Sequence, residues 1–545
     1  MKFNKLYILT FLVAGLFSSC KDELNVQNPN QPTPESAATE KGILLLSKGG
    51  VYVNGFRGLS DPKFVDGVPG YFWSGAMGIH SLLGDEVGCE AANWYLNQIG
   101  CPDEVTFDDG TKLANPNSPK QQVALLRAVN DNANQGANPI IHEWANMYAL
   151  NNACNNMLTI VERVPFATGG DAKKKTIQAW AYWWKGFAYA HIGSIYYAGL
   201  INNTANETNG NYVTKEAIIA ESNANFDKAK TILAGLGAGD ADYKSTIAAV
   251  IPVYNRTKII TPAEWLRNIN TMKARNILVN TPLASMSAAQ WTAIAALTAD
   301  GIKAGDEVFA GRSDAAGEFL AAATGTVSAK TISTAPGGGT YKLSERLVQD
   351  FKAGDKRLDN NFLLGTFWNG NVDRGNVFNT RYALKDGATG AKDIAILGSR
   401  TAGVYTLYMG CSYEENELMK AEAAISTGSI APGLAAIDAV RTFQGAGLPA
   451  SGTLTKADAY EELRKERRSA LAFRGLAFYD ARRWGVINDL AKGGGRSNCV
   501  VVDKAGKVNT KATINYNYLD YWDVPDNELV YNPAAGGSAP TRNPR

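Results

Sequence analysis

Long amphipathic segments, one after another, constrain the fold of this chain more than any other feature of its sequence. Residues 142–164 place Trp144 and Leu158 on one helical stripe, and residues 172–197 repeat the pattern through Trp180. Further segments of the same kind are 214–236, 261–280, 412–427, 431–443 and 455–473. The sequence therefore predicts a mostly α-helical protein.

Residues at the ends of these segments indicate separate helices joined by loops. Thr214 is an expected N-cap, and Thr261 is another, followed by Pro262 at the first helical position. Gly186 beside Trp184 is typical of the close helix crossings of tetratricopeptide-like pairs. We therefore expect the helices to pack as antiparallel pairs of this kind.

The repeat period of such pairs is poorly kept, because loop-rich insertions interrupt it. These insertions lie near residues 49–120, 280–341 and 354–411. Binding residues are often carried by loops on a rigid scaffold. We expect residues 37–545 to form a single helical domain whose irregular loops form the ligand-binding side.

The N-terminus has the pattern of a bacterial lipoprotein signal. A short basic start precedes an apolar run, residues 6–17, which is too short to span a bilayer. Small residues then lead to Cys20, whose thiol would take the lipid. We predict a signal peptide over residues 1–19 and a lipidated, proline-rich flexible tether over residues 20–36.

Residues 21–24, KDEL, add the cellular location to this prediction. A lysine and two acids directly after Cys20 resemble the surface-export signal of Bacteroidetes lipoproteins. The resemblance implies a protein anchored by lipid to the outer membrane and exposed on the cell surface. A secreted protein without lipid is the alternative.

Charge and cysteine content exclude some classes of partner. The net charge is +2, so no overall field favours nucleic acid. Cys89 and Cys101 bracket a short polar loop, and either a disulfide between them or free buried thiols fits the sequence. No CxxC spacing suggests a zinc site.

Catalytic motifs are missing from the sequence. It contains no nucleophile elbow, phosphate-binding loop, dinucleotide fingerprint or H-E-x-x-H. Carboxylates cluster at Asp85, Glu86 and Glu90 and at Asp108 and Asp109, but such clusters are common in polar loops. We expect no enzyme and no cofactor. A structural calcium ion in a loop is an alternative that no EF-hand spacing supports.

The segment 464–485, RKERRSALAFRGLAFYDARRWG, combines arginines with aromatic residues. On a helical wheel Arg464, Arg468 and Arg482 lie mostly away from the apolar stripe, and Gly475 allows a kink or close packing. A nucleic-acid site needs an extended basic surface on a positive domain. We interpret these arginines as a solvated or salt-bridged face of the scaffold.

The same segment resembles the C-terminal signature of the SusD/RagB outer-membrane lipoproteins, roughly ERR-x-ELAFEG-x-R-x-x-DL-x-RWG. Other segments resemble this family in the same order: the CKDE start and residues 179–200, 341–363, 408–425, 433–445 and 521–533. The chain departs from the family pattern at two places. Arg474 and Leu476 stand where the family signature commonly has an acid and a polar residue, and the usual YGD-x-P does not follow residues 179–200.

The resemblance implies a scaffold of four tetratricopeptide-like helix pairs and a non-catalytic role in polysaccharide utilisation. Such a protein captures an oligosaccharide and delivers it to a SusC-like TonB-dependent outer-membrane transporter. Import of oligopeptides or another nutrient by the same architecture is one alternative, and a surface glycoside hydrolase is another. Nucleic acid is not an expected partner.

Aromatic residues in loops are the candidates for sugar binding. The C–H face of a sugar ring stacks on an aromatic side chain, and its hydroxyls bond to amides, carboxylates and arginine. The candidate ligand-binding residues are Trp94, Tyr95, Asn97, Trp368, Arg374 and Trp73. For each of the three tryptophans, packing of the loop against the scaffold is the alternative.

Other aromatic residues belong to the predicted core. Those on helical stripes or in the terminal segment are Trp144, Trp180, Trp184, Trp484 and Trp522. His191 falls on an apolar stripe, which favours a hydrogen-bonded core histidine over a ligand.

Overall fold

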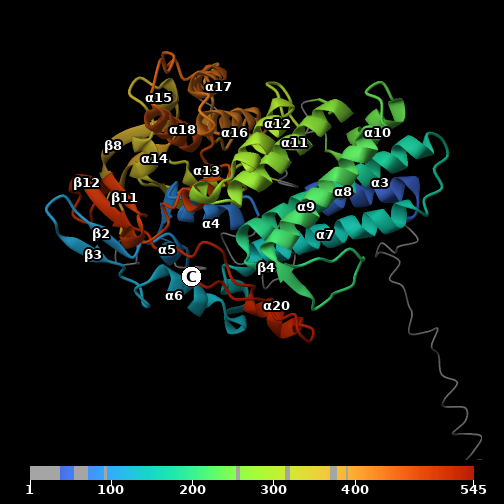
Figure 1. The fold of residues 1–545 in the computed structure, drawn as a ribbon, viewed down its shortest axis with the longest axis horizontal. Coiled ribbons are helices and arrows are strands. Elements are labelled where there is room, and N and C mark those ends of the chain that lie inside the picture. The colour runs from blue at the N-terminus through green and yellow to red at the C-terminus, as the bar shows by residue number, and fades with distance from the viewer. Residues whose placement is uncertain are drawn as a thin grey trace, which may run out of the picture.

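The computed structural model describes residues 37–53, 72–90, 95–252, 258–313, 320–368, 377–387 and 391–545. Helices dominate this part of the chain (Figure 1), which confirms the predicted mostly α fold of tetratricopeptide-like pairs. The predicted signal peptide and tether, with Cys20, lie outside the described residues, as do Trp94 and Arg374.

The helices of the N-terminal half are α3 (Glu40–Lys48), α4 (Ala76–Leu83), α5 (Leu96–Ile99), α6 (Gln122–Val129), α7 (Ile141–Val161), α8 (Gly170–Ile195), α9 (Lys215–Leu233), α10 (Ala241–Val250), α11 (Pro262–Val279) and α12 (Ala288–Ala299). α8 packs against both α7 and α9, and the three run side by side in Figure 1. Short 3-10 or π turns are η1 (Gly49–Val53), η4 (Asn132–Ala137), η6 (Leu283–Ser285) and η9 (Leu490–Lys492).

The predicted helix starts are confirmed by their hydrogen bonds. Thr214 caps α9 by accepting from the backbone N–H of Ala217. Thr261 and Glu264 form a reciprocal capping box at the start of α11. The side chain of Thr261 accepts from the Glu264 N–H at 3.2 Å, and the Glu264 carboxylate accepts from the Thr261 N–H at 2.7 Å.

The close crossing predicted at Gly186 is also present. A Cβ atom at this position would lie 2.7 Å from the ring of Phe226 on α9. Any side chain at residue 186 would therefore push α8 and α9 apart.

The helices of the C-terminal half are α13 (Val327–Thr331), α14 (Glu345–Gln349), α15 (Lys356–Asn361), α16 (Tyr413–Ser426), α17 (Ile430–Phe443), α18 (Lys456–Ala470), α19 (Ala477–Arg483) and α20 (Asp526–Tyr531). The arginine-rich segment is two helices rather than one kinked helix. α18 ends at Ala470, and Phe473 and Gly475 then turn the chain at φ values of 61° and 72°. Gly475 thus supports a break between α18 and α19.

Short strands tie distant segments together. They are β1 (Val87–Cys89), β2 (Glu104–Thr106), β3 (Lys112–Ala114), β4 (Ala198–Leu200), β5 (Tyr212–Thr214), β6 (Ala310–Arg312), β7 (Tyr341–Leu343), β8 (Phe362–Trp368), β9 (Thr380–Leu384), β10 (Thr406–Tyr408), β11 (Arg496–Val502) and β12 (Val508–Asn515). The largest sheet has the order β11-β12-β2-β3 and is antiparallel throughout. Ile514 pairs with Val105 in this sheet, so the C-terminal hairpin completes a sheet begun near residue 104.

The hydrophobic core runs through most of the described chain, from Ile43 to Val524. Four of the tryptophans predicted to be in the core are buried there: Trp144, Trp180, Trp184 and Trp522. The prediction for Trp484 is wrong, because this residue is only partly buried. It follows the last residue of α19, where Gly485 turns the chain at φ 74°, and its indole reaches the surface.

The structure also answers two questions about the cysteines and about membrane-spanning helices. Cys89 and Cys101 are both buried and unbridged, so of the two alternatives the free thiols are the ones present. Among the described residues, no helix combines the length and the apolar character needed to cross a bilayer.

Candidate functional site

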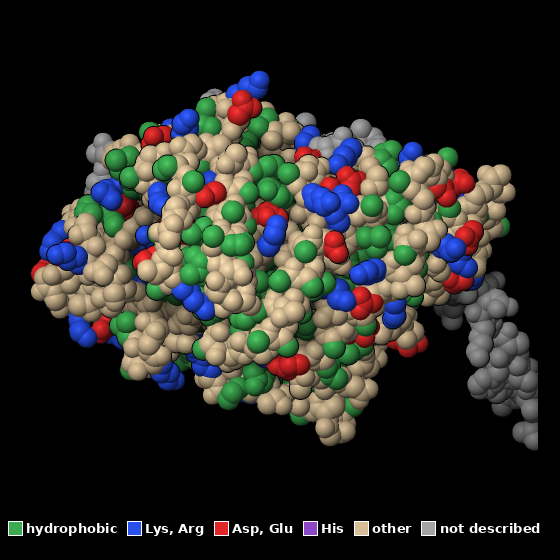
Figure 2. Space-filling model, turned by 45° about the horizontal axis from the view of Figure 1, so that its top comes forward, with side chains coloured by type: hydrophobic (Ala, Val, Ile, Leu, Met, Phe, Trp, Pro, Cys, Tyr) green, Lys and Arg blue, Asp and Glu red, His purple; other side chains and the backbone are tan. Residues whose placement is uncertain are grey.

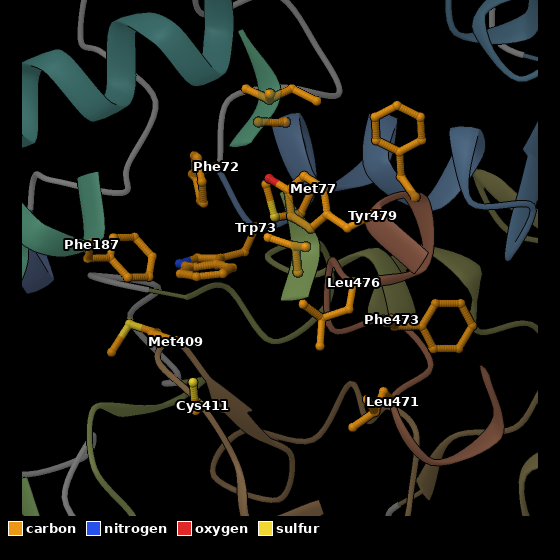
Figure 3. Packing of buried hydrophobic residues seen from close by; sticks show 14 of the residues in the cluster. Phe72, Trp73, Met77, Phe187, Met409, Cys411, Leu471, Phe473, Leu476 and Tyr479 are labelled. Carbon is orange, nitrogen blue, oxygen red and sulfur yellow. The ribbon is translucent and has the colours of Figure 1, made fainter. Parts of the chain in front are cut away.

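The structure places Trp73 inside the scaffold rather than on an open surface. Its side chain is 7% exposed, and its ring meets Phe72 edge-on with centroids 4.9 Å apart. Figure 3 shows the indole close to Met77 and Met409, which line the same small cavity of about 30 Å³. In this arrangement Trp73 offers little surface to a sugar, and its predicted ligand role stays a prediction.

Tyr95 and Asn97 flank the start of α5. Tyr95 has a φ of 54°, and its partly buried ring packs against the core. Asn97 is 7% exposed. Their predicted partner, Trp94, lies outside the described residues, so the stacking role proposed for this loop is untested.

Trp368 is the last residue of β8, and its backbone pairs with Thr380 of β9. β9 contacts β7, which pairs with β1 from Val87 to Cys89. The chain enters the segment of Trp94 after β1 and the segment of Arg374 after β8. The roots of the two predicted binding loops are therefore connected through β7 and β9.

The carboxylates that could have served a hydrolase have structural partners. Asp85 pairs with Arg346, and Glu86 accepts from Ser81 Oγ at 2.7 Å and from the Phe473 N–H at 2.8 Å. Burial raises the pKa of Glu86 to about 7. Asp108 accepts from two backbone N–H groups of β12. These carboxylates are therefore held in contacts within the fold.

Among the described residues, no group of three or more His, Cys, Asp or Glu side chains is arranged so that it could hold a metal ion. His191 is hydrogen-bonded as predicted: its Nδ1 lies 2.8 Å from Glu143, whose other oxygen lies 2.7 Å from His80 Nε2. Burial alone would raise the pKa of Glu143, but the two histidines outweigh it and lower that pKa to about 2. Sequence periodicity did not reveal this His–Glu–His cluster, because its members come from three helices.

The arginines of the signature are mostly buried, which corrects the expected solvated face. Arg468 donates to Asp350 at 2.5 Å, and Arg467 donates to Asp480 at 2.8 Å. The salt-bridged part of that interpretation is confirmed for Arg468 and for Arg464, whose pair with Glu461 is partly exposed. On the face shown in Figure 2, Lys and Arg are interspersed with Asp and Glu.

Arg482 lies on the floor of an open cleft of about 850 Å³. Its guanidinium donates to the carbonyls of Ser194, at 2.7 Å, and Val279, at 2.9 Å, near the ends of α8 and α11. It also stacks on the ring of Tyr521 at 3.9 Å. The C-termini of helices carry partial negative charge, so Arg482 ties the ends of these two helices together. The expectation that Arg482 lies on a solvated face is therefore wrong.

This cleft combines aromatic and polar side chains. Its lining residues are Tyr197, Lys215, Val279, Asn280, Pro282, Leu283, Ala284, Arg482, Arg483, Trp484, Gly485, Asn488, Lys492, Asp520, Tyr521, Asn543, Pro544 and Arg545. The partly exposed Trp484 forms one wall. A partly exposed indole ring with amide groups nearby can bind a sugar, because the ring stacks on the sugar and the amides bond to its hydroxyl groups.

A second cavity lies on the other side of Trp484, and we call it the arginine pocket. Its volume is about 520 Å³, and its lining residues are Arg346, Gln349, Asp350, Glu461, Arg464, Lys465, Trp484, Val486, Gly493, Gly495, Arg496, Ser497, Asn498 and Cys499. β11 and α14 form part of it and lie in contact. Sequence patterns did not single out Arg496, although the glycine run at residues 493–495 before it signals a special backbone.

Comparison with known proteins places the C-terminal part of the chain. The SusD family model matches residues 415–535, which include α18, α19 and the β11–β12 hairpin. This part of the chain is therefore similar to the SusD/RagB family. No curated protein sequence matches the chain.

Solved structures are also similar to this chain, at low sequence identity. One, crystallised with xylogluco-oligosaccharide, has a TM-score of 0.54 and 13% identity, covering 92% of this chain and 100% of its own. A SusD-like protein from Bacteroides fragilis has a TM-score of 0.49 and 14% identity, covering 84% and 92%. A SusD-like carbohydrate-binding protein from Bacteroides vulgatus has a TM-score of 0.49 and 13% identity, covering 86% and 98%.

Proposed function

We propose that this protein is a lipid-anchored, cell-surface glycan-binding protein of the SusD/RagB family that captures an oligosaccharide and delivers it to a SusC-like TonB-dependent transporter in the outer membrane. The observation that carries the proposal is the family match, together with a fold shared over nearly the whole chain with a structure that holds xylogluco-oligosaccharide. Acylation of Cys20 would supply the anchor.

The binding site belongs to the loops that leave β1 and β8. Trp94 would stack on a sugar ring with Tyr95 and Asn97 beside it, and Trp368 would form a second platform near Arg374. The connection between the two strand roots supports a common site, because β7 pairs with β1 and contacts β9 of the β8–β9 hairpin.

Binding without catalysis is supported by the chemistry of the described residues. A retaining or inverting glycosidase needs two carboxyl groups free to act on one glycosidic bond. Asp85 and Glu86, the most prominent acid pair of the sequence, are buried in structural contacts. We therefore assign degradation of the polysaccharide to other proteins.

Calorimetry with neutral oligosaccharides tests the proposal. Trp94→Ala and Trp368→Ala should each weaken binding by roughly 30-fold, about 2 kcal/mol, because a stacking aromatic is a binding hot spot. Tyr531→Ala is the matched control, since this tyrosine is 80% exposed on α20. Binding of oligopeptides in place of sugars, or hydrolysis of the sugar by the purified protein, would contradict the proposal.

A further inference from the structure

The arginine pocket has more positive than negative side chains. Its lining contains four cationic residues and two carboxylates. The cationic residues are Arg346, Arg464, Lys465 and Arg496, and the carboxylates are those of Asp350 and Glu461. The pocket therefore has an excess of positive charge before its ion pairs are assigned.

Assigning the ion pairs leaves Arg496 without a close partner. Arg346 holds Asp85 with contacts of 2.6 and 2.9 Å. Asp350 is held by Arg468 at 2.5 Å, and a single carboxylate, Glu461, serves both rim cations, Arg464 and Lys465. For Arg496 the only ion-pair contact within the described chain is from Nε to Asp85 Oδ2, at 4.0 Å.

Arg496 is also deeply placed. Its side chain is 11% exposed, and its Nε is buried without a hydrogen-bond partner among the described residues. A guanidinium carries five N–H donors, and buried donors in native proteins are nearly always satisfied. Burial by itself would lower the pKa of Arg496, but Tyr516 and Asp350 outweigh it and raise that pKa, so the charge is kept.

We propose that the arginine pocket is a binding site for an acidic sugar, whose carboxylate or sulfate group contacts Arg496. A planar guanidinium bonds to such oxyanions through two parallel N–H donors, which a buried ion pair at 4.0 Å does not allow. The anion supplies the negative charge that the lining residues lack.

The rest of the pocket suits the sugar that carries this anion. Its volume of about 520 Å³ lies within the range of small-molecule sites. Trp484 forms one wall, and the Arg483 guanidinium lies 4.5 Å from its ring centre, which fixes the indole. Ser497 and Asn498 are exposed at the rim, where they can bond to hydroxyl groups.

The residues of this site come from α14, α18, β11 and the segment between α19 and β11. The identification of the ligand as an acidic sugar depends on the proposed glycan-binding function. The contact between an anion and Arg496 depends only on the geometry of the arginine pocket. The protein would thus hold neutral units of a glycan in its loops and charged units beside Trp484.

Calorimetry on the full folded chain tests the site with trigalacturonic acid, a sulfated chondroitin disaccharide, a neutral xyloglucan oligosaccharide and sodium sulfate. Arg496→Gln should weaken binding of the acidic saccharides at least 10-fold and leave the neutral one unchanged. Arg464→Gln, at the partly exposed rim, should weaken binding of the acidic saccharides about 3-fold, as for one partly screened charge. Binding should also fall as salt rises.

Arg163→Gln is the matched control, because Arg163 is exposed just after α7 and lines neither of the two cavities beside Trp484. Thermal unfolding of each variant shows that it is folded, and Arg464→Glu provides a charge reversal at the rim if Arg496→Gln proves unstable. The inference is overturned when acidic saccharides bind the wild-type protein no more tightly than neutral ones do. It is also overturned when they bind the Arg496→Gln and Arg464→Glu variants as tightly as wild type. So does sulfate that binds as tightly as the acidic sugars.

The two proposals fail in different ways. Loss of neutral-sugar binding in Trp94→Ala with unchanged acidic-sugar binding supports two separate sites. Loss of both in the same tryptophan variant places the acidic sugar in the loops and overturns the role of the arginine pocket, while the glycan-binding function stands.

Discussion

The α8 region and the α18–α19 region are both buried, but they are stabilised by different interactions. In α8 the rings of Trp180, Trp183 and Trp184 are fully buried. Trp183 packs on Phe309 with centroids 4.1 Å apart. In α18 the buried carboxylate of Glu466 instead holds two guanidiniums.

The ion-paired region is a connected network. Glu466 accepts from Arg357 at 2.7 Å and from Arg441 at 2.8 Å, and Arg357 also holds Asp355. Apolar burial contributes roughly in proportion to area, whereas a buried ion pair contributes only while all its partners are present. Residues that are equally buried in the two regions are therefore not equally tolerant of substitution.

The largest expected effect comes from breaking the network at its shared acid. Glu466→Ala should lower the free energy of unfolding by roughly 5 kcal/mol, because it leaves two buried guanidiniums without their common partner. Urea unfolding measures this loss. Glu461→Ala is the control on the same helix, since its pair with Arg464 is partly exposed to solvent, and it should cost less than about 1 kcal/mol. Similar losses for the two variants would contradict the distinction.

Removal of a buried ring from α8 comes next. Trp183→Ala should cost roughly 4 kcal/mol through the cavity that it leaves, and it also removes the 2.9 Å hydrogen bond from Nε1 to Asn268. The indole does not titrate, so we expect the same loss in urea unfolding at pH 5 and at pH 8. A loss that changes strongly between these pH values would show that charged groups also stabilise this region.

The third and smallest effect is a gain in the free energy of unfolding rather than a loss. Glu86 has a folded-state pKa of about 7 against an ordinary value of 4.5, because it is buried. The folded state therefore binds its proton more tightly than the unfolded state, and stability falls as pH rises from 4.5 to 7. Glu86→Gln removes this cost and should stabilise the protein by roughly 2 kcal/mol at pH 8.

The gain from Glu86→Gln should nearly vanish at pH 4.5, where the carboxyl group is protonated in the folded state and half protonated in the unfolded state. Melting temperatures across this pH range measure it. Ser81→Ala is a useful companion, since it removes the hydroxyl donor to Glu86 without a change in charge. A glutamine variant less stable than wild type at pH 8 would show that the charged form is favoured in the fold.

Sequence patterns predicted the apolar scaffold well because their signals are local. The caps at Thr214 and Thr261 and the stripe through Trp180 and Trp184 depend only on neighbours along the chain. The turn at Phe473 could not be found in this way, since its positive φ ends the helical stripe where a wheel would continue it.

The buried arginines could not be predicted in the same way. Their partners are far away in sequence, as for Arg468 with Asp350 and Arg346 with Asp85. A helical wheel assigns arginine to the solvent face unless the fold is already known. The arginine pocket was missed for the same reason, because Arg496 meets α18 only in the folded chain.

The antiparallel sheet that joins β12 to β2 also has a consequence for how the protein is made. The N-terminal end of a chain is synthesised first, so the edge of β2 that pairs with β12 stays open until residues 508–515 are available. Chains that lack this hairpin expose unpaired backbone groups near Val105, where they can pair with other chains. Completion of the native state therefore waits for the β11–β12 hairpin.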